Sequence, residues 1–444
     1  MTPTIRPKDR DTLIQALRAG VVPRVGQHLI QVGRANEIDA LLKDINSLAD
    51  GGTGFRLIIG EYGSGKTFFL NLVRAIALEK KLVATTADLT PDRRIYASGG
   101  QARSLYAELS KNLSTRAKPD GGGLAGIVEK FIFTATTEAK EGGVSVDLII
   151  QKKLARLAEM VNGYDFAKVI EVYWSAHQEA NEQRKADAIR WLRGEFSTKT
   201  DARNALGVRT IVDDATVYDQ LKLMSVFVRL CGFSGLLVCL DEMVNLYKLS
   251  NSQARNANYE QILRILNDVL QGTTEGLGFV LGGTPEFLMD TRRGLYSYAA
   301  LQSRLAENTF AKDGLVDYEH PVIRLSSLSQ EDFLVLLHKI QHVFAYGDDA
   351  RYLLPEEALS AFMSHCQQRI GEAYFRTPRT TITAFVNLLA VLEQNPGTDW
   401  KSLLGEISVT KDEGGAADLA LETEIVAASP TGANSDDEFA KFKL

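Results

Sequence analysis

The sequence predicts an α/β fold in which a parallel sheet lies between helices, with a large helical insertion and an all-helical segment after the sheet. Three observations predict this class. The stretch 55–59 is apolar on nearly every residue, which is typical of a strand buried on both faces of a parallel sheet. A glycine-rich turn and a helical pattern follow it directly. Long helical patterns then separate it from two more apolar strands, at 235–240 and 278–281.

The composition is that of a folded globular chain. Of its 444 residues, 45% are hydrophobic and 24% are charged, and the formal net charge is −6. The apolar runs fall far short of the roughly 18 residues of a membrane-spanning helix, and the first residues lack a signal core, so we expect a cytoplasmic protein without a membrane segment. Cys231, Cys239 and Cys366 are too widely spaced for a disulfide framework or a zinc cluster, and we expect buried free thiols.

The order of the patterns divides the chain into four segments. We expect an N-terminal helical segment at 1–54, a sheet-containing core at 55–325, a helical segment at 326–395 and a mostly disordered acidic tail at 396–444. From Lys411 onward there are eight acidic residues against three lysines, so nearly all of the net charge lies in the tail.

Each element is predicted from its pattern. An amphipathic stretch at 36–48 precedes the first strand, and a helix at 67–78 and a strand at 82–87 follow the glycine-rich turn. From about 96 to 233 the chain changes to helical patterns broken by glycines, which predicts a helical insertion with helices at 101–113, 126–137, 147–161 and 166–193. Three helices complete the fold, at 330–345, 355–370 and 380–393. Ser329 and Asp332 form a plausible cap for the first of these, and Pro355 suits the first turn of the second.

The strongest functional signal is a full G-x-x-x-x-G-K-T motif between a strand and a helix. Its glycines let backbone N–H groups cradle phosphates at a helix N-terminus, where the partial positive charge favours an anion. We expect Lys66 to reach the β- and γ-phosphates and the Thr67 hydroxyl to bind Mg²⁺. A chance glycine-rich turn is the alternative, and the flanking strand and helix argue against it. The expected nucleotide-binding residues here are Gly60, Glu61, Tyr62, Gly63, Ser64, Gly65, Lys66, Thr67 and Phe68.

The second signal is an apolar strand that ends in two carboxylates, Asp241 and Glu242. We expect Asp241 to hold Mg²⁺ through its water shell, and Glu242 to orient and deprotonate the attacking water. A solvated strand end is the alternative, and the presence of the phosphate loop argues against it.

A threonine and several arginines complete the candidates. Thr284 follows the third strand, at the end where open α/β sheets bind ligands, and its hydroxyl is a candidate contact for the γ-phosphate or the water. Simple turn chemistry from the neighbouring Gly-Gly and Thr-Pro pairs is the alternative. A guanidinium can meet the charge of a transferring phosphoryl group, in cis or from a neighbouring subunit. The candidates are Arg292, Arg293, Arg304 and Arg379, although a single arginine is more often a surface residue.

The order of these motifs resembles the AAA+ superfamily, particularly the initiator clade around Orc and Cdc6. Val32, Gly33 and Arg34 are similar to that clade's motif beside the adenine, and Ser303-Arg304-Leu305 is similar to its arginine-finger segment. The three helices after the core match its lid, with Thr377-Pro378-Arg379 similar to a sensor arginine at the start of the last lid helix. No winged-helix pattern follows the lid, so the resemblance does not imply DNA contact of the initiator kind.

A closer resemblance is to the ATP-binding protein family of bacterial BREX phage-defence systems, whose short member is similar in size. It spans about 9–394 and is carried by Gly20-Val21-Val22-Pro23, Trp191-Leu192-Arg193-Gly194-Glu195 and Gly235-Leu236-Leu237. The family implies an ATPase that uses ATP and Mg²⁺ and acts with other defence components, including a helicase, on invading DNA. AAA+ relatives assemble as rings or spirals, which implies a homo-oligomer in which Arg304 completes a neighbour's site.

Two functions remain open at this stage. The first is an oligomeric ATPase motor acting on DNA or on a DNA-bound partner, because a passive binder has no need of a water-activating carboxylate. The second is a nucleotide-gated switch or loader that holds a partner through the insertion and the tail segment 439–444 and turns over slowly. The charges of the insertion nearly balance, which argues against a constitutive DNA clamp. Tyr173, Trp174 and Trp191 are candidates for stacking on bases, but aromatic residues at this helical spacing are more often core residues.

Overall fold

The computed structural model describes residues 5–311, 315–406 and 409–410. Its centre is one parallel sheet with the strand order β2-β3-β4-β1-β5. The strands are β1 (Gly54–Ile59), β2 (Val83–Asp88), β3 (Leu236–Asp241), β4 (Leu277–Gly283) and β5 (Val322–Arg324). The first four confirm the predicted strands to within two residues. The edge strand β5 was not expected, because three residues are too few to show a pattern.

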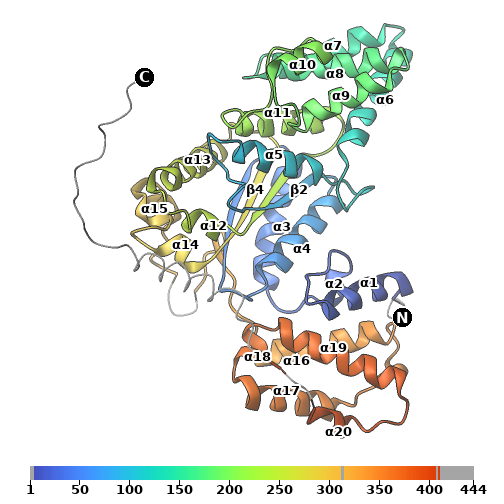
Figure 1. Ribbon diagram of the computed structural model, residues 1–444, viewed down its shortest axis with the longest axis vertical. Coiled ribbons are helices and arrows are strands. Elements are labelled where there is room, and N and C mark those ends of the chain that lie inside the picture. Colours follow the sequence, from blue (N-terminus) through green and yellow to red (C-terminus); the bar gives the residue numbers. More distant parts are fainter. Residues whose placement is uncertain (1–4, 312–314, 407–408, 411–444) are drawn as a thin grey trace, which may run out of the picture.

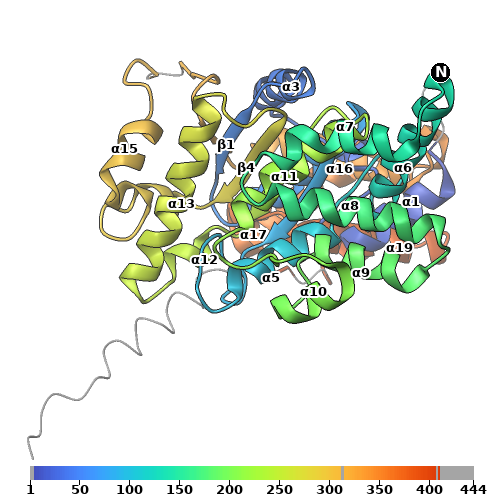
Figure 2. The same cartoon turned by 90° about the horizontal axis from the view of Figure 1, so that it is seen from above.

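The alternation of side chains along each strand assigns the helices to the two faces of the sheet. Leu57, Val238 and Phe279 point to a core that α5 (Gln101–Lys111), α11 (Val217–Leu230) and α13 (Ser252–Leu270) help to form. Their neighbours Ile58, Cys239 and Val280 point to the other face, which α3 (Ala35–Ala49) and α4 (Lys66–Glu79) cover. Figures 1 and 2 show the sheet between these helices. All three cysteines are buried free thiols, as the sequence predicted.

The helical insertion lies beyond one end of the sheet, at the top of Figure 1. It contains α6 (Leu124–Gly142), α7 (Val146–Ala158), α8 (Gly163–Gln178), α9 (Glu182–Leu192) and α10 (Lys199–Leu206). The single helix predicted at 166–193 is wrong, because the chain turns at Ala180, where φ is 53°. The Asn181 side chain then caps α9 by accepting a hydrogen bond from the backbone N–H of Arg184.

The Trp-Leu-Arg-Gly-Glu segment anchors the insertion to the core. Trp191 is 1% exposed and its ring N–H donates to the carbonyl of Thr210, at 2.8 Å. The carbonyl of Leu192 accepts a hydrogen bond from the hydroxyl of Tyr106 on α5, at 2.9 Å. Tyr173 and Trp174 are also buried. These aromatic residues are therefore core, as their spacing predicted.

Four further short helices and one 3-10 helix complete the region outside the insertion and the C-terminal helices. They are α12 (Val244–Tyr247), α14 (Pro285–Met289), η1 (Leu295–Ser297), α15 (Ala299–Leu305) and, beside the phosphate loop, α2 (Gln27–Ile30). Among the described residues, no helix combines the length and apolar character needed to cross a membrane.

The C-terminal helices share a hydrophobic core with the N-terminal ones. They are α16 (Gln330–Phe344), η2 (Asp349–Arg351), α17 (Glu356–Ile370), α18 (Ala373–Arg376), α19 (Arg379–Gln394) and α20 (Trp400–Leu404), and they lie at the bottom of Figure 1. Leu13 and Leu17 of α1 (Pro7–Arg18) and Ile30 of α2 pack among them. The carbonyl of Leu17 accepts a hydrogen bond from Thr383 of α19, at 3.0 Å. The helices of the expected N-terminal segment 1–54 therefore pack in two places: α1 and α2 lie with the C-terminal helices, and α3 packs on the sheet.

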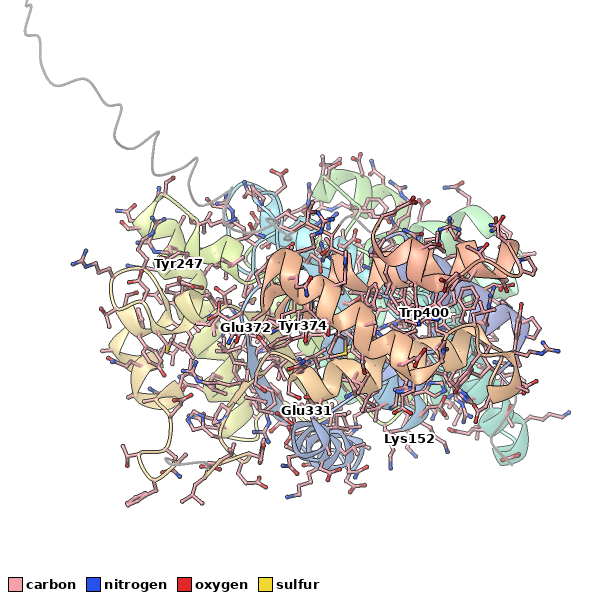
Figure 3. The ribbon with its side chains drawn as sticks, turned by 90° about the horizontal axis from the view of Figure 1, so that it is seen from below. Lys152, Tyr247, Glu331, Glu372, Tyr374 and Trp400 are labelled. Carbon is pink, nitrogen blue, oxygen red and sulfur yellow. The ribbon has the colours of Figure 1, made fainter. Side chains whose placement is uncertain are left out.

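The predicted helix caps of this region are confirmed in part. Ser329 and Asp332 form a reciprocal capping box at the start of α16, and Pro355 is the N-cap residue of α17. Part of the segment 396–444, which was expected to be disordered, is helical. Helix α20 begins at Trp400, whose side chain packs against this core (Figure 3). Val409 is also buried in it. The acidic tail from Lys411 onward and its segment 439–444 lie outside the described residues.

A buried carboxylate links two parts of the insertion and gives a test of this fold. Asp165 of α8 is 6% exposed, and one of its oxygens accepts hydrogen bonds from the N–H groups of Arg209 and Thr210 and from the Thr210 hydroxyl. We expect Asp165→Ala to lower the free energy of unfolding by about 3 kcal/mol, because buried donors lose their partner.

The measurement is the chemical denaturation midpoint of the purified chain. Glu182→Ala is the matched control, because the Glu182 side chain is 79% exposed and solvent screens its ion pair with Lys185, so its loss should stay below about 1 kcal/mol. Equal losses for the two variants would contradict the anchoring role of Asp165.

Candidate functional site

The loop from Gly60 to Thr67 joins β1 to α4. Gly63 and Gly65 have φ angles of 78° and 81°, in the left-handed region that glycine adopts without strain. Helix α4 begins at Lys66, so the loop ends at a helix N-terminus, where backbone N–H groups favour an anion. Locally, the geometry is that of a phosphate-binding loop.

The Lys66 ammonium lies across this loop. It donates hydrogen bonds to the carbonyls of Gly60, at 2.8 Å, and Glu61, at 2.9 Å. Burial lowers the pKa of Lys66, and the charges of Asp241 and Glu242 oppose this shift. The ammonium is therefore both desolvated and close to the carboxylates that follow β3.

The two predicted motifs meet through a hydrogen bond. The Thr67 hydroxyl donates to one carboxylate oxygen of Asp241, at 2.6 Å, and the other oxygen accepts from the backbone N–H of Glu242, at 2.9 Å. Gly282 on the neighbouring strand β4 leaves room for this carboxylate, because an added Cβ would lie 2.5 Å from it. A hydroxyl and a carboxylate that lie side by side supply oxygen atoms, the ligands that Mg²⁺ prefers.

Glu242 has an uncommon backbone conformation. Its φ is 57°, which residues other than glycine adopt rarely and mostly where the surroundings impose it. Its side chain lines the cavity described below. Burial raises the pKa of Glu242, and the charge of Asp241 raises it further. The raised pKa makes this carboxylate, next to the phosphate loop, a better proton acceptor than a glutamate with an ordinary pKa.

A cavity of about 200 Å³ lies between the phosphate loop and the C-terminal helices. One end is polar and is lined by Lys66, Thr67 and Glu242. The other end is apolar and is built from the N-terminal turn 20–23, from Ile30 and Val32, and from C-terminal residues that include Leu336 and Ile382. A polar end beside a helix N-terminus and an apolar end suit a ligand with phosphates and a planar base.

The remaining loop candidates differ in how they face the cavity. Tyr62, Gly63, Ser64, Gly65 and Phe68 line it, as do Val32 and Arg34. Gly33 instead packs against Asp332, whose carboxylate would lie 3.2 Å from an added Cβ. Gly60 lies where the loop leaves β1, and an added Cβ there would meet the Ser64 hydroxyl.

The structure places only one of the four candidate arginines at the cavity. Arg379 lines it and donates to the Tyr62 hydroxyl at 3.4 Å. Arg304 is exposed on α15 and donates to the carbonyl of Ala300, at 2.8 Å. The Arg293 guanidinium is held by the carbonyls of Tyr247 and Leu249. Arg292 is exposed, and within the described chain it lies outside the cavity lining.

Thr284 has a local role in the structure. It is the N-cap of α14, and its hydroxyl accepts a hydrogen bond from the backbone N–H of Phe287, at 3.4 Å. This contact is the turn chemistry that the sequence offered as the alternative reading.

Two residues of the site were missed by sequence reasoning. Asp88 ends β2 directly opposite Asp241 in the sheet register, and burial raises its pKa, as does the charge of Asp241. Gly282 supports Asp241 from β4. Both stand at the carboxyl ends of strands, and this shared position is the signal that could have found them.

Comparison with known protein families gives one match over most of the chain. Residues 5–408 match the family described as BREX system ATP-binding protein BrxC/D. No curated protein matches the chain. The matched span includes the phosphate loop, β3 and its carboxylates, the helical insertion and the C-terminal helices.

The contact between Gly282 and Asp241 gives a test of the site. We expect Gly282→Ala to push the Asp241 carboxylate away from Thr67, since the new methyl group would overlap it. Loss of a contact that orients a metal ligand typically costs about 10- to 100-fold in metal affinity. The factor by which Mg²⁺ strengthens ATP binding should therefore be at least about tenfold smaller in Gly282→Ala than in the unchanged protein. The measurement is the ATP dissociation constant by calorimetry, with and without Mg²⁺.

Gly278→Ala is the matched control on the same strand. Its methyl group would meet the end of the Leu48 side chain, which can move, and not Asp241. An unchanged Mg²⁺ effect in Gly282→Ala, or an equal loss in Gly278→Ala, would show that the packing of Asp241 does not set the metal site.

Proposed function

The chain belongs to the BrxC/D family of BREX system ATP-binding proteins, and from this premise we propose that it is an AAA+ ATPase of a bacterial anti-phage defence system. One observation carries the hydrolytic part of the proposal. The Thr67 hydroxyl meets Asp241 at 2.6 Å, and Lys66 and Glu242 lie beside this contact at the polar end of the cavity. A protein that only retained ATP would gain nothing from a carboxylate with a raised pKa at this position.

Each of the four side chains has a distinct part in the proposed reaction. Lys66 leaves the carbonyls of Gly60 and Glu61 and binds the β- and γ-phosphates. Thr67 and Asp241 supply oxygens for Mg²⁺, and the ion when bound would neutralise charge on the phosphates. Glu242 orients a water molecule for attack on the γ-phosphorus and accepts its proton, while the bond from the γ-phosphorus to the bridging oxygen breaks and ADP leaves. Arg379, from the C-terminal helices, reaches the same cavity and can meet charge on the γ-phosphate.

The arrangement of the units supports an AAA+ organisation. We propose a core at 55–325 with the helical insertion at about 96–233, a lid at 326–395, and an N-terminal segment at 1–54 whose first two helices move with the lid. The support is the shared hydrophobic core of α1, α2 and the C-terminal helices. Since the cavity is lined from both sides, ATP would bridge lid and core. We further propose that the protein acts in the cytoplasm.

We propose a homo-oligomer in which Arg304 of one subunit faces the nucleotide of the next. Arg304 is exposed, and it is not among the described residues that line the cavity of its own chain. A permanently charged guanidinium on the surface is suited to complete a site in trans. The partners would be other defence components, among them a helicase, with DNA as the substrate on which the assembly acts.

The alternative is a nucleotide-gated switch or loader that hydrolyses ATP slowly and contacts proteins rather than DNA. The position of Arg304 outside the cavity favours slow hydrolysis by an isolated chain, because a single chain would lack the arginine that a neighbouring subunit supplies. The two functions share the ATP site and differ in what accelerates turnover.

Steady-state ATP hydrolysis with and without DNA tests the proposed function. We expect Glu242→Gln to keep ATP affinity but to lose at least about 100-fold in kcat, because the general base is removed. Lys66→Ala should instead weaken ATP binding. Stimulation by single- or double-stranded DNA would support the motor, and slow turnover that DNA does not change would support the switch. Wild-type single-turnover rates in Glu242→Gln would show that Glu242 is not the base.

Mixing two inactive variants tests the trans arginine. Arg304→Ala and Glu242→Gln should each be inactive, whereas their mixture should regain part of the activity at interfaces that combine an intact Arg304 with an intact Glu242. Arg203→Ala, which removes an exposed arginine of α10 in the insertion, is the control and should hydrolyse ATP normally. Light scattering after size-exclusion chromatography should show assembly with a non-hydrolysed ATP analogue. A strict monomer under those conditions would remove the trans role.

A further inference from the structure

Arg34 occupies a turn that directs its side chain to the phosphate loop. It follows Gly33 and precedes α3, and both residues have left-handed φ angles, 60° and 61°. A non-glycine residue is uncommon in this conformation and usually has a structural or functional cause. Resemblance placed Arg34 beside the adenine, whereas the structure shows its guanidinium on the polar side of the cavity.

The guanidinium of Arg34 binds two segments that are far apart in the sequence. Its Nη2 donates to the carbonyl of Ser64 in the phosphate loop and to the carbonyl of Ser326 between β5 and α16, the latter at 3.3 Å. Its Nη1 would lie 3.5 Å from a Cβ added to Gly65, so the side chain packs directly against the loop. The Phe69 ring centroid is 5.9 Å from the guanidinium carbon.

The contact with Ser64 fixes the orientation of one peptide group in the loop. Ser64 and Gly65 share a planar trans peptide, in which the C=O and the N–H point in opposite directions. A donor that holds the Ser64 carbonyl therefore turns the Gly65 N–H to the other side of the peptide. Successive backbone N–H groups that point to one side make a concave site for an anion.

The same turn is fastened to the C-terminal helices. Gly33 packs against Asp332 in the capping box of α16. The Lys339 ammonium of α16 donates to the carbonyl of Gln31, two residues before Gly33. The contact with Ser326 adds a third link, on the chain that leads from the sheet into α16. Segment 31–34 thus touches the phosphate loop on one side and the first C-terminal helix on the other.

From these contacts we infer that Arg34 is a positioning residue that holds the phosphate loop in its anion-binding conformation and ties it to the start of α16. It acts through the Ser64 carbonyl and not through the base of the nucleotide. The inference rests on the proposed function only in that the ligand carries a polyphosphate chain, and it needs no hydrolysis.

A ligand without a base separates the two roles of Arg34. We would measure dissociation constants of ATP and of inorganic tripolyphosphate by calorimetry, for the unchanged protein, Arg34→Ala and Arg34→Lys. Arg34→Ala should raise the dissociation constants of both ligands by the same factor, at least about tenfold, which corresponds to about 1.4 kcal/mol of binding free energy. Arg34→Lys should recover only part of this loss, because a single ammonium lacks the planar fork of donors.

Lys339→Met is the matched control. It removes a cationic side chain of α16 that donates to the same turn but does not contact the phosphate loop. The affinity for tripolyphosphate should therefore stay within about threefold of that of the unchanged protein. The series is repeated at high salt, where simple attraction between Arg34 and the phosphates would be screened but a fixed loop geometry would persist.

Several results would overturn the inference. Weaker ATP binding with unchanged tripolyphosphate binding would place Arg34 at the base. A loss that disappears at high salt, or full recovery in Arg34→Lys, would show that only charge matters. If Arg34→Ala does not fold, Arg34→Lys and Arg34→Gln are compared with the same two ligands. A protein that binds tripolyphosphate as expected but does not hydrolyse ATP would refute the proposed function and leave the role of Arg34 intact.

Discussion

The hydrogen bond from Thr67 to Asp241 joins residues 174 positions apart, and the rest of the site depends on it. It forms because β1 and β3 end at the same edge of a parallel sheet with β4 between them. Lys66 precedes one member of the pair and Glu242 follows the other, so this single contact places four chemical groups. Gly282 makes the contact possible, because a side chain on β4 would occupy the space of the Asp241 carboxylate.

The second constraint is the shared core of the N-terminal and C-terminal helices. Since α1 and α2 pack with α16 to α19, the apolar end of the cavity is built from both ends of the described chain. The phosphate loop touches this unit closely: a Cβ on Gly63 would lie 2.7 Å from the Thr377 side chain. A ligand in the cavity would therefore contact the phosphate loop and the helical unit together.

Local signals predicted much of the fold. The phosphate loop, the Asp241-Glu242 pair and four strands could be predicted, because each is defined by the glycine spacing or the apolar run of consecutive residues. The turn at Ala180, the strand β5 and the packing of α1 on α19 were not, because they depend on tertiary contacts between distant segments. The same limit applies to the site. Asp88 and Gly282 act through the sheet register, and the contact from Arg34 to Ser64 crosses 30 residues of chain.

The most direct test of the central claim is a crystal structure of the chain with Mg²⁺ and a non-hydrolysed ATP analogue. The expected result is a Mg²⁺ ion at about 2.1 Å from the Thr67 hydroxyl, with Asp241 in its ligand or water shell. The Lys66 ammonium should have left the carbonyls of Gly60 and Glu61 for the phosphates, and Glu242 should face the γ-phosphate. Phosphates bound elsewhere, or Lys66 still held by the two carbonyls with nucleotide present, would contradict the account.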